Sequence, residues 1–402
     1  MTYDFTSILN RHGQDSIAVD GLGDGMGSSP AKPRAGFDSI PMWVADMGFA
    51  TAPSVVEAMR ARLDQPHFGY YQARDAYYEA IMDWHRTRKG VHDLEREHIG
   101  YENGVLGGVV SALGALCSPG DNVLVHSPTY VGFTHAVGDH GYHLVHSPLV
   151  LDEAGVWRMD FDDMERRIVE NHVHAAIFCS PHNPCGRVWE RWEIERAMEV
   201  FEAHDVYVVS DEIWSDLLLD GHVHVPTQQV SPWAHEHVVA LYAPSKTFNL
   251  AGLIGSYHVI YNPWLRDRVQ REGSLSHYNA QNVLSMHALM GAYSPEGGEW
   301  ADELCQVLSA NARYAYEHIR DTYPGVTCAR AEGTYVLLAD CREWCERSAM
   351  SYERLVRAGW DIGVTWHDGR LFDCPGSVRI AVSVPHAQVI EAFARLDKYV
   401  FV

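Results

Sequence analysis

The chain has 402 residues, of which 47% are hydrophobic and 21% charged, and its formal net charge is −22. This length exceeds what one simple core needs and predicts a soluble globular protein with two domains, or with one large and one small domain. The negative charge disfavours nucleic acid and anionic membranes as partners, and no apolar run approaches the ~20 residues of a membrane-spanning helix.

The first residues and the cysteines both bear on the compartment. Residues 1–5 open without a basic segment and an apolar core, so we expect no signal peptide. Eight cysteines are scattered along the chain, and a protein of this length does not need disulfide bonds, so we expect reduced thiols in the cytoplasm. Pairs such as His172 and His174 place two imidazoles on one face of a strand, but no further ligands follow at a convincing spacing. We therefore expect no metal site.

The first three quarters of the chain predict an arm followed by a large domain. Residues 1–50 are expected to be an extended arm that belongs to the smaller domain, and a helix is expected from residues 51–54, with Pro53 in its first turn. Apolar runs then alternate with helical patterns, and strands are predicted at 99–101, 122–126, 143–150, 175–179, 206–210, 238–243 and 256–260. This alternation indicates an α/β domain over 51–296, with a mostly parallel central sheet wrapped by helices on both faces.

The C-terminal part predicts a second, smaller domain. After the glycines at 297 and 298, a long helical pattern runs through Arg320. Strands are expected at 334–339 and 378–382, among further helices. This mixture indicates a small α+β domain over 297–402.

Three of the expected strands of the large domain end in polar residues. Asn183 follows the strand at 175–179, Asp211 follows the one at 206–210, and Lys246 follows the one at 238–243. Ligands bind at the carboxyl ends of the strands in an open α/β sheet, so we expect these three side chains to lie close together. A lysine kept from water loses proton affinity and becomes a nucleophile, whereas a surface lysine at a strand end is the plain alternative.

Asparagine, aspartate and lysine in this order are what a pyridoxal phosphate (PLP) site needs. Lys246 can hold the aldehyde carbon of the cofactor, Asp211 can pair with the pyridinium nitrogen, and Asn183 can donate a hydrogen bond to the phenolate oxygen. Asn183 beside a proline is also an ordinary turn former, and Asp211 could lie in a solvated turn, so the prediction depends on the set of three. The stretch 104–109 opens an apolar helix whose N-terminus suits a phosphate, although close helix packing would explain the same three glycines.

With these residues in place, the chain resembles a known family, the PLP enzymes with the aspartate-aminotransferase fold. Within that family it is most similar to the MalY/PatB branch, the cystathionine β-lyases. The stretches that carry the resemblance occur in the family's order and span nearly the whole chain. They are 41–47, 68–70, 104–109, 127–130, 180–187, 211–213, 245–249 and 379–381. The string Trp-Val-Ala-Asp-Met at 43–47 is the most branch-specific of them.

The resemblance implies roles for further residues around the cofactor. Tyr130 is expected to stack on the ring and to take part in catalysis, and Ser245 is expected to bind the phosphate. Tyr242 is expected near the phosphate or, with equal weight, in the core. The other expected cofactor contacts are Val105, Leu106, Ile213 and Trp214.

The resemblance also implies contacts to the substrate and to a second subunit. Arg379 is expected to grip the substrate carboxylate through a bidentate fork, although an arginine that opens an edge strand usually has no function. Asp46 and Met47 are expected to line the substrate site. Tyr70 is expected to reach the phosphate in the neighbouring subunit, which would make the protein a homodimer; otherwise its aromatic loop is only packing.

Elimination and transamination begin with the same steps, and resemblance at the level of the fold does not choose between them. Many aminotransferases carry an arginine where this chain has Ile254 and a tyrosine where it has Trp214, and the lyase branch departs from them at the same places. Gly48 and Ala18-Val19 depart from the pattern of the branch itself and leave the substrate open. We expect a cytoplasmic, homodimeric carbon–sulfur lyase that converts cystathionine or a similar cysteine thioether to a thiol, pyruvate and ammonia. The alternatives are an aminotransferase and a PLP-binding regulatory protein with little turnover.

Overall fold

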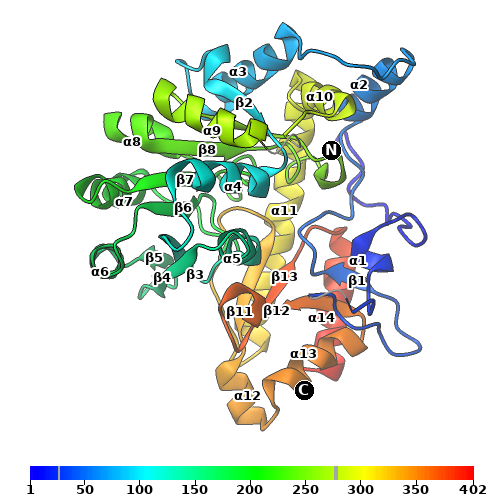
Figure 1. Ribbon diagram of the computed structural model, residues 1–402. Helices are drawn as coiled ribbons and strands as arrows, with labels where there is room; N and C mark the ends of the chain where they lie inside the picture. Colours follow the sequence, from blue (N-terminus) through cyan, green and yellow to red (C-terminus); the bar gives the residue numbers. More distant parts are fainter. Residues whose placement is uncertain (26–27, 276–278) are drawn as a thin grey trace.

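The computed structural model describes residues 1–25, 28–275 and 279–402, and the chain folds around two β-sheets (Figure 1). Within these residues, the larger sheet has eight strands in the order β2-β9-β8-β7-β6-β3-β4-β5, and the smaller sheet has five in the order β1-β12-β13-β11-β10. The strands of the larger sheet are β2 (Ile99–Glu102), β3 (Asn122–Ser127), β4 (His143–Leu151), β5 (Trp157–Met159), β6 (Ala175–Cys179), β7 (Tyr207–Asp211), β8 (Val238–Tyr242) and β9 (Ser256–Val259). Those of the smaller sheet are β1 (Ile40–Met42), β10 (Thr327–Cys328), β11 (Val336–Asp340), β12 (Val364–Asp368) and β13 (Ser377–Ala381).

The centre of the larger sheet is parallel, as the sequence predicts. The strands β4, β3, β6, β7 and β8 pair in parallel, while β5, β9 and β2 are added at the two sides by antiparallel pairing. Every residue of β6 and β8 is buried, because helices cover both faces of the sheet. Alternate residues of a strand pack into two separate cores, with Val209 and Leu241 in one and Val208 and Tyr242 in the other.

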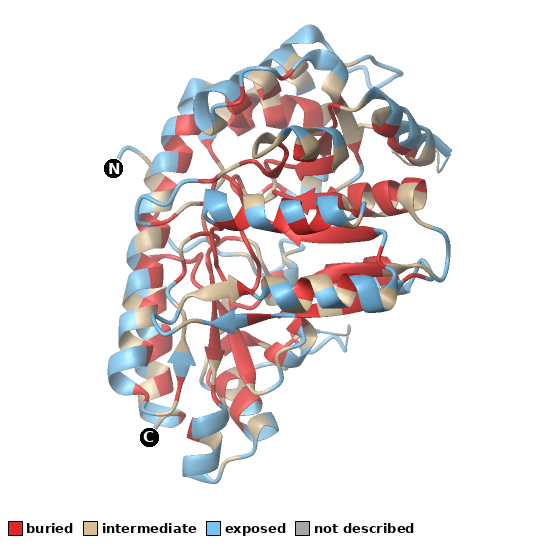
Figure 2. Cartoon of the chain, turned by 90° about the vertical axis from the view of Figure 1, so that its left-hand side faces the viewer, coloured by how far each residue is buried: buried red, intermediate tan, exposed pale blue. Residues whose placement is uncertain are grey.

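Helices cover the two faces of the larger sheet. On one face α4 packs with α5 and α9, and on the other α7 packs with α6 and α8. Figure 2 shows several strands in the interior as buried, and many helices as exposed on their outer faces. No helix in the described part of the chain combines the length and the apolarity needed to cross a membrane. The helices are α1 (Ile17–Asp20), α2 (Pro53–Leu63), α3 (Asp75–Lys89), α4 (Val105–Leu116), α5 (Val131–Gly138), α6 (Phe161–Asn171), α7 (Arg191–Ala203), α8 (Pro232–His237), α9 (Pro263–Leu275), α10 (Val283–Ala292), α11 (Pro295–Thr322), α12 (Arg342–Ser348), α13 (Tyr352–Asp361) and α14 (His386–Tyr399).

The 28-residue helix α11 runs alongside both parts of the molecule (Figure 1). Ser294 caps it, because its Oγ accepts a hydrogen bond from the Gly297 N–H, and Pro295 occupies the first turn. The sequence predicted a helix only after the two glycines at 297 and 298, but both lie inside it. A Cβ at Gly297 would lie 2.0 Å from Ala292 O, so only glycine fits where α10 and α11 meet.

The smaller sheet combines residues from the two ends of the chain. In the N-terminal arm, of which residues 26–27 lie outside the described part, β1 pairs in parallel with β12 and places Ile40 opposite Val364. Arg379 lies on β13, the middle strand of the sheet, and not on an edge strand as the sequence suggested. The short strands β1, β5 and β10 and the five-residue β12 were not predicted.

Candidate active site

A cavity of about 250 Å³ lies at the carboxyl ends of β6, β7 and β8, beside the N-terminus of α4. Parallel strands bring their carboxyl ends to one edge of the sheet, so side chains from distant parts of the sequence meet there. Most of the predicted cofactor-binding residues line this cavity. They are Val105, Leu106, Tyr130, Asn183, Asp211, Ile213, Trp214, Ser245 and Lys246.

Lys246 lies in the turn that follows β8. Its Nζ donates a hydrogen bond to Ala45 O at 2.8 Å and lies 5.5 Å from the centre of the Trp214 ring. Burial, together with the positive charge of Arg379, lowers the pKa of the lysine amine to about 8. Nζ is therefore much closer to its neutral, nucleophilic form at neutral pH than the amine of a surface lysine.

Asp211 ends β7 and is buried. Its Oδ1 accepts a hydrogen bond from the Ile213 N–H at 3.1 Å, and within the described residues the carboxylate forms no ion pair. Burial raises the pKa of this carboxyl to about 7, against the weaker, opposite effect of Lys246. A buried carboxylate without a cation at bonding distance fits a ligand that presents a protonated nitrogen.

Arg379 comes from the smaller sheet and does not itself line the cavity, but it contacts Asn183, which does. Its Nη1 donates to Asn183 Oδ1 at 3.1 Å, and its Nη2 donates to Trp43 O at 2.7 Å. The residue is 2% exposed, its Nε has no acceptor among the described residues, and burial lowers the pKa of the guanidinium to about 10. A buried guanidinium that pairs with no carboxylate of the described chain fits an anionic group of a ligand.

The N-terminus of α4 forms another wall of the cavity. Gly104 precedes the helix with a φ of 82°, which favours glycine, and Val105 and Leu106 follow. The first N–H groups of a helix have no intrahelical partner and favour an anion. Gly108 lets the helix approach the sheet, because a Cβ there would lie 2.7 Å from Leu241 Cδ2. The close packing that the sequence allowed is thus present, and the anion site stays a prediction.

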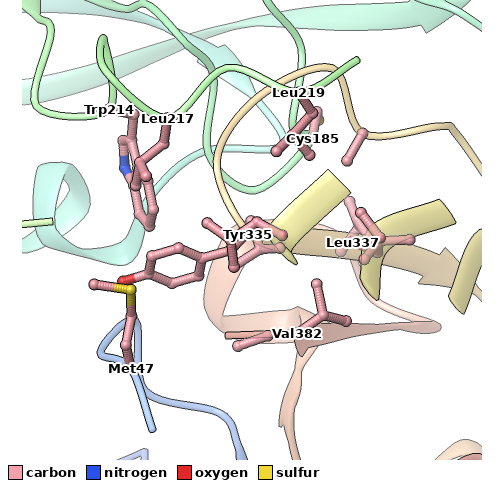
Figure 3. Close-up of a cluster of buried hydrophobic side chains, with 14 of the residues drawn as sticks. Met47, Cys185, Trp214, Leu217, Leu219, Tyr335, Leu337 and Val382 are labelled. Carbon is pink, nitrogen blue, oxygen red and sulfur yellow. The ribbon is translucent and has the colours of Figure 1, made fainter. Parts of the chain in front are cut away.

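Two aromatic rings face the cavity from loops that follow β3 and β7. Tyr130 is the N-cap of α5 and packs edge-to-face against Phe133, with 5.4 Å between the ring centres. Trp214 packs edge-on against Tyr335, which precedes β11, with 4.7 Å between the ring centres (Figure 3). These contacts fix both rings at the wall, while stacking of Tyr130 on a cofactor stays a prediction.

Tyr242 does not line the cavity. Its hydroxyl donates to Glu212 Oε2 at 2.9 Å and accepts from Gln228 Nε2 at 2.9 Å. The side chain lies in the core on one face of the larger sheet, opposite to its neighbour Leu241. The structure favours the core position over a contact to phosphate, because alternate residues of a strand face opposite sides.

Tyr70 lies away from the cavity in the single chain. Its side chain is fully exposed and lines a separate surface hollow with Phe68, Tyr71 and Gln281. An exposed aromatic loop needs a partner surface to account for it. Its reach into a second subunit stays a prediction.

Asp46 and Met47 lie beside the cavity, next to Ala45. Asp46 forms an ion pair with Arg11 at 3.0 Å, and burial raises the pKa of its carboxyl. Met47 is buried, its N–H donates to Asn249 Oδ1 at 3.1 Å, and its carbonyl accepts from Asn249 Nδ2 at 3.0 Å. Arg11 and Asn249 thus hold the turn that supplies the carbonyl to Lys246, while direct contacts to a substrate stay a prediction.

Sequence reasoning missed three groups next to the site. Ala45 acts through its carbonyl, which leaves no side-chain signal. Arg11 lies in the arm, far from any motif. His367 Nδ1 lies 2.9 Å from Arg379 Nη2, and the two residues are paired across β12 and β13. Only a prediction of β12 with its register could have found this last contact.

The polar groups of the site fit a small molecule with three features. Lys246 suits an aldehyde, Asp211 suits a protonatable ring nitrogen, and the N-terminus of α4 suits an anion. PLP combines these features in one molecule. Among the described residues, no cluster of histidine, cysteine, aspartate or glutamate could hold a metal ion.

Comparisons with known proteins show which family the chain is similar to. Cystathionine beta-lyase PatB of Bacillus subtilis (strain 168) is 34% identical over 355 residues, which cover 88% of this chain and 89% of PatB. Protein MalY of Escherichia coli (strain K12) is 29% identical and covers 98% of both chains. The structure of the PLP-bound C-S lyase from Staphylococcus hominis is similar at a TM-score of 0.88 and 27% identity, over 99% of this chain and 98% of that one.

The fold is confirmed as aspartate-aminotransferase-like. A Thermus thermophilus aspartate aminotransferase shares it at a TM-score of 0.80 and 23% identity, over 90% of this chain and 92% of that one. Residues 41–396 match the family model of aminotransferase class I and II. The chain therefore belongs to the aminotransferase class I and II family.

Proposed function

We propose that the protein is a PLP-dependent carbon–sulfur lyase, which eliminates a thiol from cystathionine or another S-substituted cysteine. The reaction consumes water and leaves pyruvate and ammonia. The observation that carries the proposal is that Lys246, Asp211 and Asn183 line one cavity, and that Arg379 is hydrogen-bonded to Asn183 directly behind its wall. The proposal is also supported by the 34% sequence identity to a cystathionine β-lyase over most of both chains.

Each of these residues at the cavity binds a different part of the cofactor. Lys246 holds the aldehyde carbon, Asp211 keeps the ring nitrogen protonated, and Asn183 donates to the phenolate oxygen. The N-terminus of α4 and Ser245 bind the phosphate. When bound, PLP supplies the electron sink that stabilises a carbanion at the substrate Cα.

Lys246 is the base of the reaction. With PLP and substrate bound, its Nζ would remove the Cα proton, and its lowered pKa keeps the amine partly neutral for this step. Ala45 O holds Nζ at 2.8 Å in the position from which it acts. The proton taken up at Nζ is then available to the departing sulfur.

Arg379 orients the substrate. Its guanidinium binds the substrate carboxylate, which leaves rotation about the Cα bonds as the freedom that remains. Holding the carboxylate would also limit the directions that the Cβ–S bond can take, which matters because elimination depends on that direction. Tyr130 and Trp214 cover the cavity wall and keep water from the reacting atoms.

Two positions favour elimination over transamination. Ile254 lines the cavity where many aminotransferases place an arginine, and Trp214 stands where they place a tyrosine. Ile254 also has a φ of 55°, a strained conformation for a β-branched residue. The lyase branch departs from the aminotransferases at both positions.

The active unit is a homodimer, in which Tyr70 of each chain completes the site of the other. Support comes from the exposed side chains of Phe68 and Tyr70, which a second chain would cover. A hollow of about 930 Å³ also opens beside the cavity and shares Asn103, Leu106 and Tyr130 with it. This hollow gives a partner loop room to approach the phosphate end.

The protein works in the cytoplasm as two domains. All eight cysteines are unpaired, which suits a reducing compartment. The domain boundaries are residues 51–296 for the PLP-binding domain and 297–402, together with the arm 1–50, for the smaller one. The pairing of β1 with β12 supports the place of the arm.

The test is a turnover assay without any keto acid. The purified, PLP-loaded protein is incubated with L-cystathionine, and pyruvate and free thiol are measured. We expect both products in equal amounts, and none from Lys246→Ala. No pyruvate from cystathionine or from any other cysteine thioether would overturn the proposal.

A further inference from the structure

The guanidinium of Arg379 is held in place by three acceptors from three different segments. Trp43 O comes from the arm, Asn183 Oδ1 from the loop after β6, and His367 Nδ1 from β12. His367 is the only ionisable side chain among the three. A plain apolar residue at its position would leave one N–H of Nη2 without an acceptor.

The geometry fixes the protonation state of His367. Arginine can only donate, so Nδ1 must carry a lone pair and the ring proton must sit on Nε2. The ring is neutral as well, because burial and the charge of Arg379 hold the pKa of His367 well below its usual range. The Nε2 atom is buried and finds no acceptor among the described residues. A buried, unpaired N–H destabilises the fold, so its retention needs a reason.

The ring of His367 is itself held rigidly. It packs edge-to-face on Trp43, with 5.3 Å between the ring centres, and at 5.6 Å against Phe372. Phe372 also stacks under the guanidinium, 4.3 Å from its centre. The antiparallel register pairs His367 directly with Arg379. The imidazole therefore has one orientation, and its lone pair points to Nη2.

We propose that His367 is a positioning residue, which fixes the plane of the Arg379 guanidinium for the substrate carboxylate. This inference rests on the proposed function of Arg379 as the carboxylate site. With Trp43 O and His367 Nδ1 on Nη2, both hydrogens of that nitrogen are engaged. The donor that remains for a ligand is the second hydrogen of Nη1, because Nε is buried. Arg379 would thus bind the carboxylate through one hydrogen bond and not through the two-point fork that the sequence suggested, since either fork needs a free hydrogen on Nη2.

Two kinds of substitution separate positioning from packing. His367→Asn keeps an acceptor, because Oδ1 of asparagine lies where Nδ1 of histidine lies. His367→Leu and His367→Phe keep apolar volume but remove the acceptor, and phenylalanine also keeps the edge-to-face contact with Trp43. Using both apolar variants guards against one of them failing to fold. His318→Leu is the control, because His318 is a partly buried histidine of the smaller domain, bonded to Asp397 at 2.8 Å and away from the cavity.

The experiment compares two ligands of the PLP-loaded protein that differ only in the carboxylate. S-methyl-L-cysteine and its decarboxylated counterpart, 2-(methylthio)ethylamine, are titrated, and binding is read from the visible absorbance of the holoenzyme. In the wild type the amino acid is expected to bind more tightly. The preference should fall about 10- to 100-fold in the two apolar variants, because one hydrogen bond that orients a charged group is lost. It should stay within about threefold of wild type in His367→Asn and in His318→Leu.

The outcome separates this inference from the proposed function. Binding of the two ligands needs no C–S cleavage, so an enzyme that makes no pyruvate can still show the expected loss of preference. In turnover, KM for the amino acid should rise in the apolar variants more than kcat falls. An unchanged preference, or an equal loss of affinity for both ligands, would overturn the role of His367. So would a failure of His367→Asn to restore the preference.

Discussion

The two ionisable residues at the centre of the site, Lys246 and Asp211, have shifted pKa values, and both shifts serve the binding of the cofactor. Burial brings the amine of Lys246 down to about 8 and the carboxyl of Asp211 up to about 7. Both shifts disfavour the charged form, as expected when polar groups lose water. Their closeness to neutral pH means that each group changes its charge within the working range of the enzyme.

The shift of Lys246 predicts the pH dependence of cofactor attachment. Only the neutral amine attacks the aldehyde, so the rate constant for reconstitution of cofactor-free protein should rise about tenfold per pH unit and level off near pH 8. The measurement is the growth of visible absorbance after PLP is mixed with the cofactor-free protein. A rate that continues to rise to pH 10, as for an ordinary lysine, would show that the amine is not buried. Lys246→Ala is the control and should show no such phase.

The shift of Asp211 predicts an unusual effect on stability. Because the folded pKa is raised, the folded state keeps its proton to higher pH than the unfolded state, and the free energy of unfolding falls between pH 4 and pH 7. Asp211→Asn removes this loss, so the cofactor-free variant should be more stable than wild type at pH 8, by about 4 kcal/mol for a shift of roughly three pKa units, and nearly equal to it at pH 4. Thermal unfolding at both pH values measures the difference.

The same variant should be a poor enzyme. An amide cannot hold the pyridinium proton by charge, so turnover should fall at least about ten- to a hundredfold although PLP still binds. A variant that is less stable than wild type at pH 8, or that keeps its turnover, would remove Asp211 from its assigned place.

At the scale of the elements, the sequence predicted the long buried strands and missed the short ones. The runs that became β6 and β8 are continuous, apolar and short, and turn-forming residues follow them, so their length and flanks identify them as buried strands. The strand β1 has three residues, one of them Pro41, and β10 has two, so their pairing depends on neighbours that periodicity does not reveal. Because β12 was missed, Arg379 was expected on an edge strand and His367 was overlooked.

The site residues also differ in how far the sequence predicts their positions. Asn183, Asp211 and Lys246 could be predicted, because the carboxyl ends of parallel strands converge by a general rule. For Tyr242 the sequence left two alternatives open, a contact to the cofactor and a place in the core. Packing decides which face of β8 its side chain lies on, and the sequence alone does not show this. Tyr70 is exposed in the chain, and its place in a second subunit stays a prediction.

The approach of α4 to the sheet predicts a contrast between two adjacent glycines. A Cβ at Gly108 would lie 2.7 Å from the buried Leu241 side chain, while one at Gly107 would meet nothing closer than 3.6 Å. Gly108→Ala should cost about 1–3 kcal/mol and weaken PLP binding, because it shifts the helix whose N-terminus is proposed to bind the phosphate. Gly107→Ala should be neutral or stabilise by up to ~1 kcal/mol through helix propensity. Thermal midpoints and PLP affinities of the two variants measure this contrast, and equal effects would contradict it.

At the scale of the whole molecule, the site depends on segments far apart in the chain. The arm supplies Ala45 O and Trp43 O, the larger sheet supplies Lys246 and Asp211, and the smaller sheet supplies Arg379. Movement of the smaller sheet against the larger one would therefore change the distance between the carboxylate site and the base. The proposed second chain adds Tyr70 to this assembly.

Mixed dimers test the contribution of the second chain. Lys246→Ala should be inactive, and Tyr70→Ala should lose about tenfold in activity when PLP is limiting, because one hydrogen bond to an anion is lost. In a hybrid of the two, one site keeps both Lys246 and Tyr70, so activity should approach half of wild type. Co-expression with two different affinity tags yields the hybrid. A hybrid no more active than the average of its parents would show that Tyr70 serves its own chain.

The most direct test of the central claim is the partition between elimination and transamination. The PLP-loaded protein is given L-cystathionine together with 2-oxoglutarate, and pyruvate, thiol and glutamate are measured in the same sample. We expect pyruvate and thiol in equal amounts, with glutamate only a minor product. Steady formation of glutamate without pyruvate would contradict it and make the protein an aminotransferase.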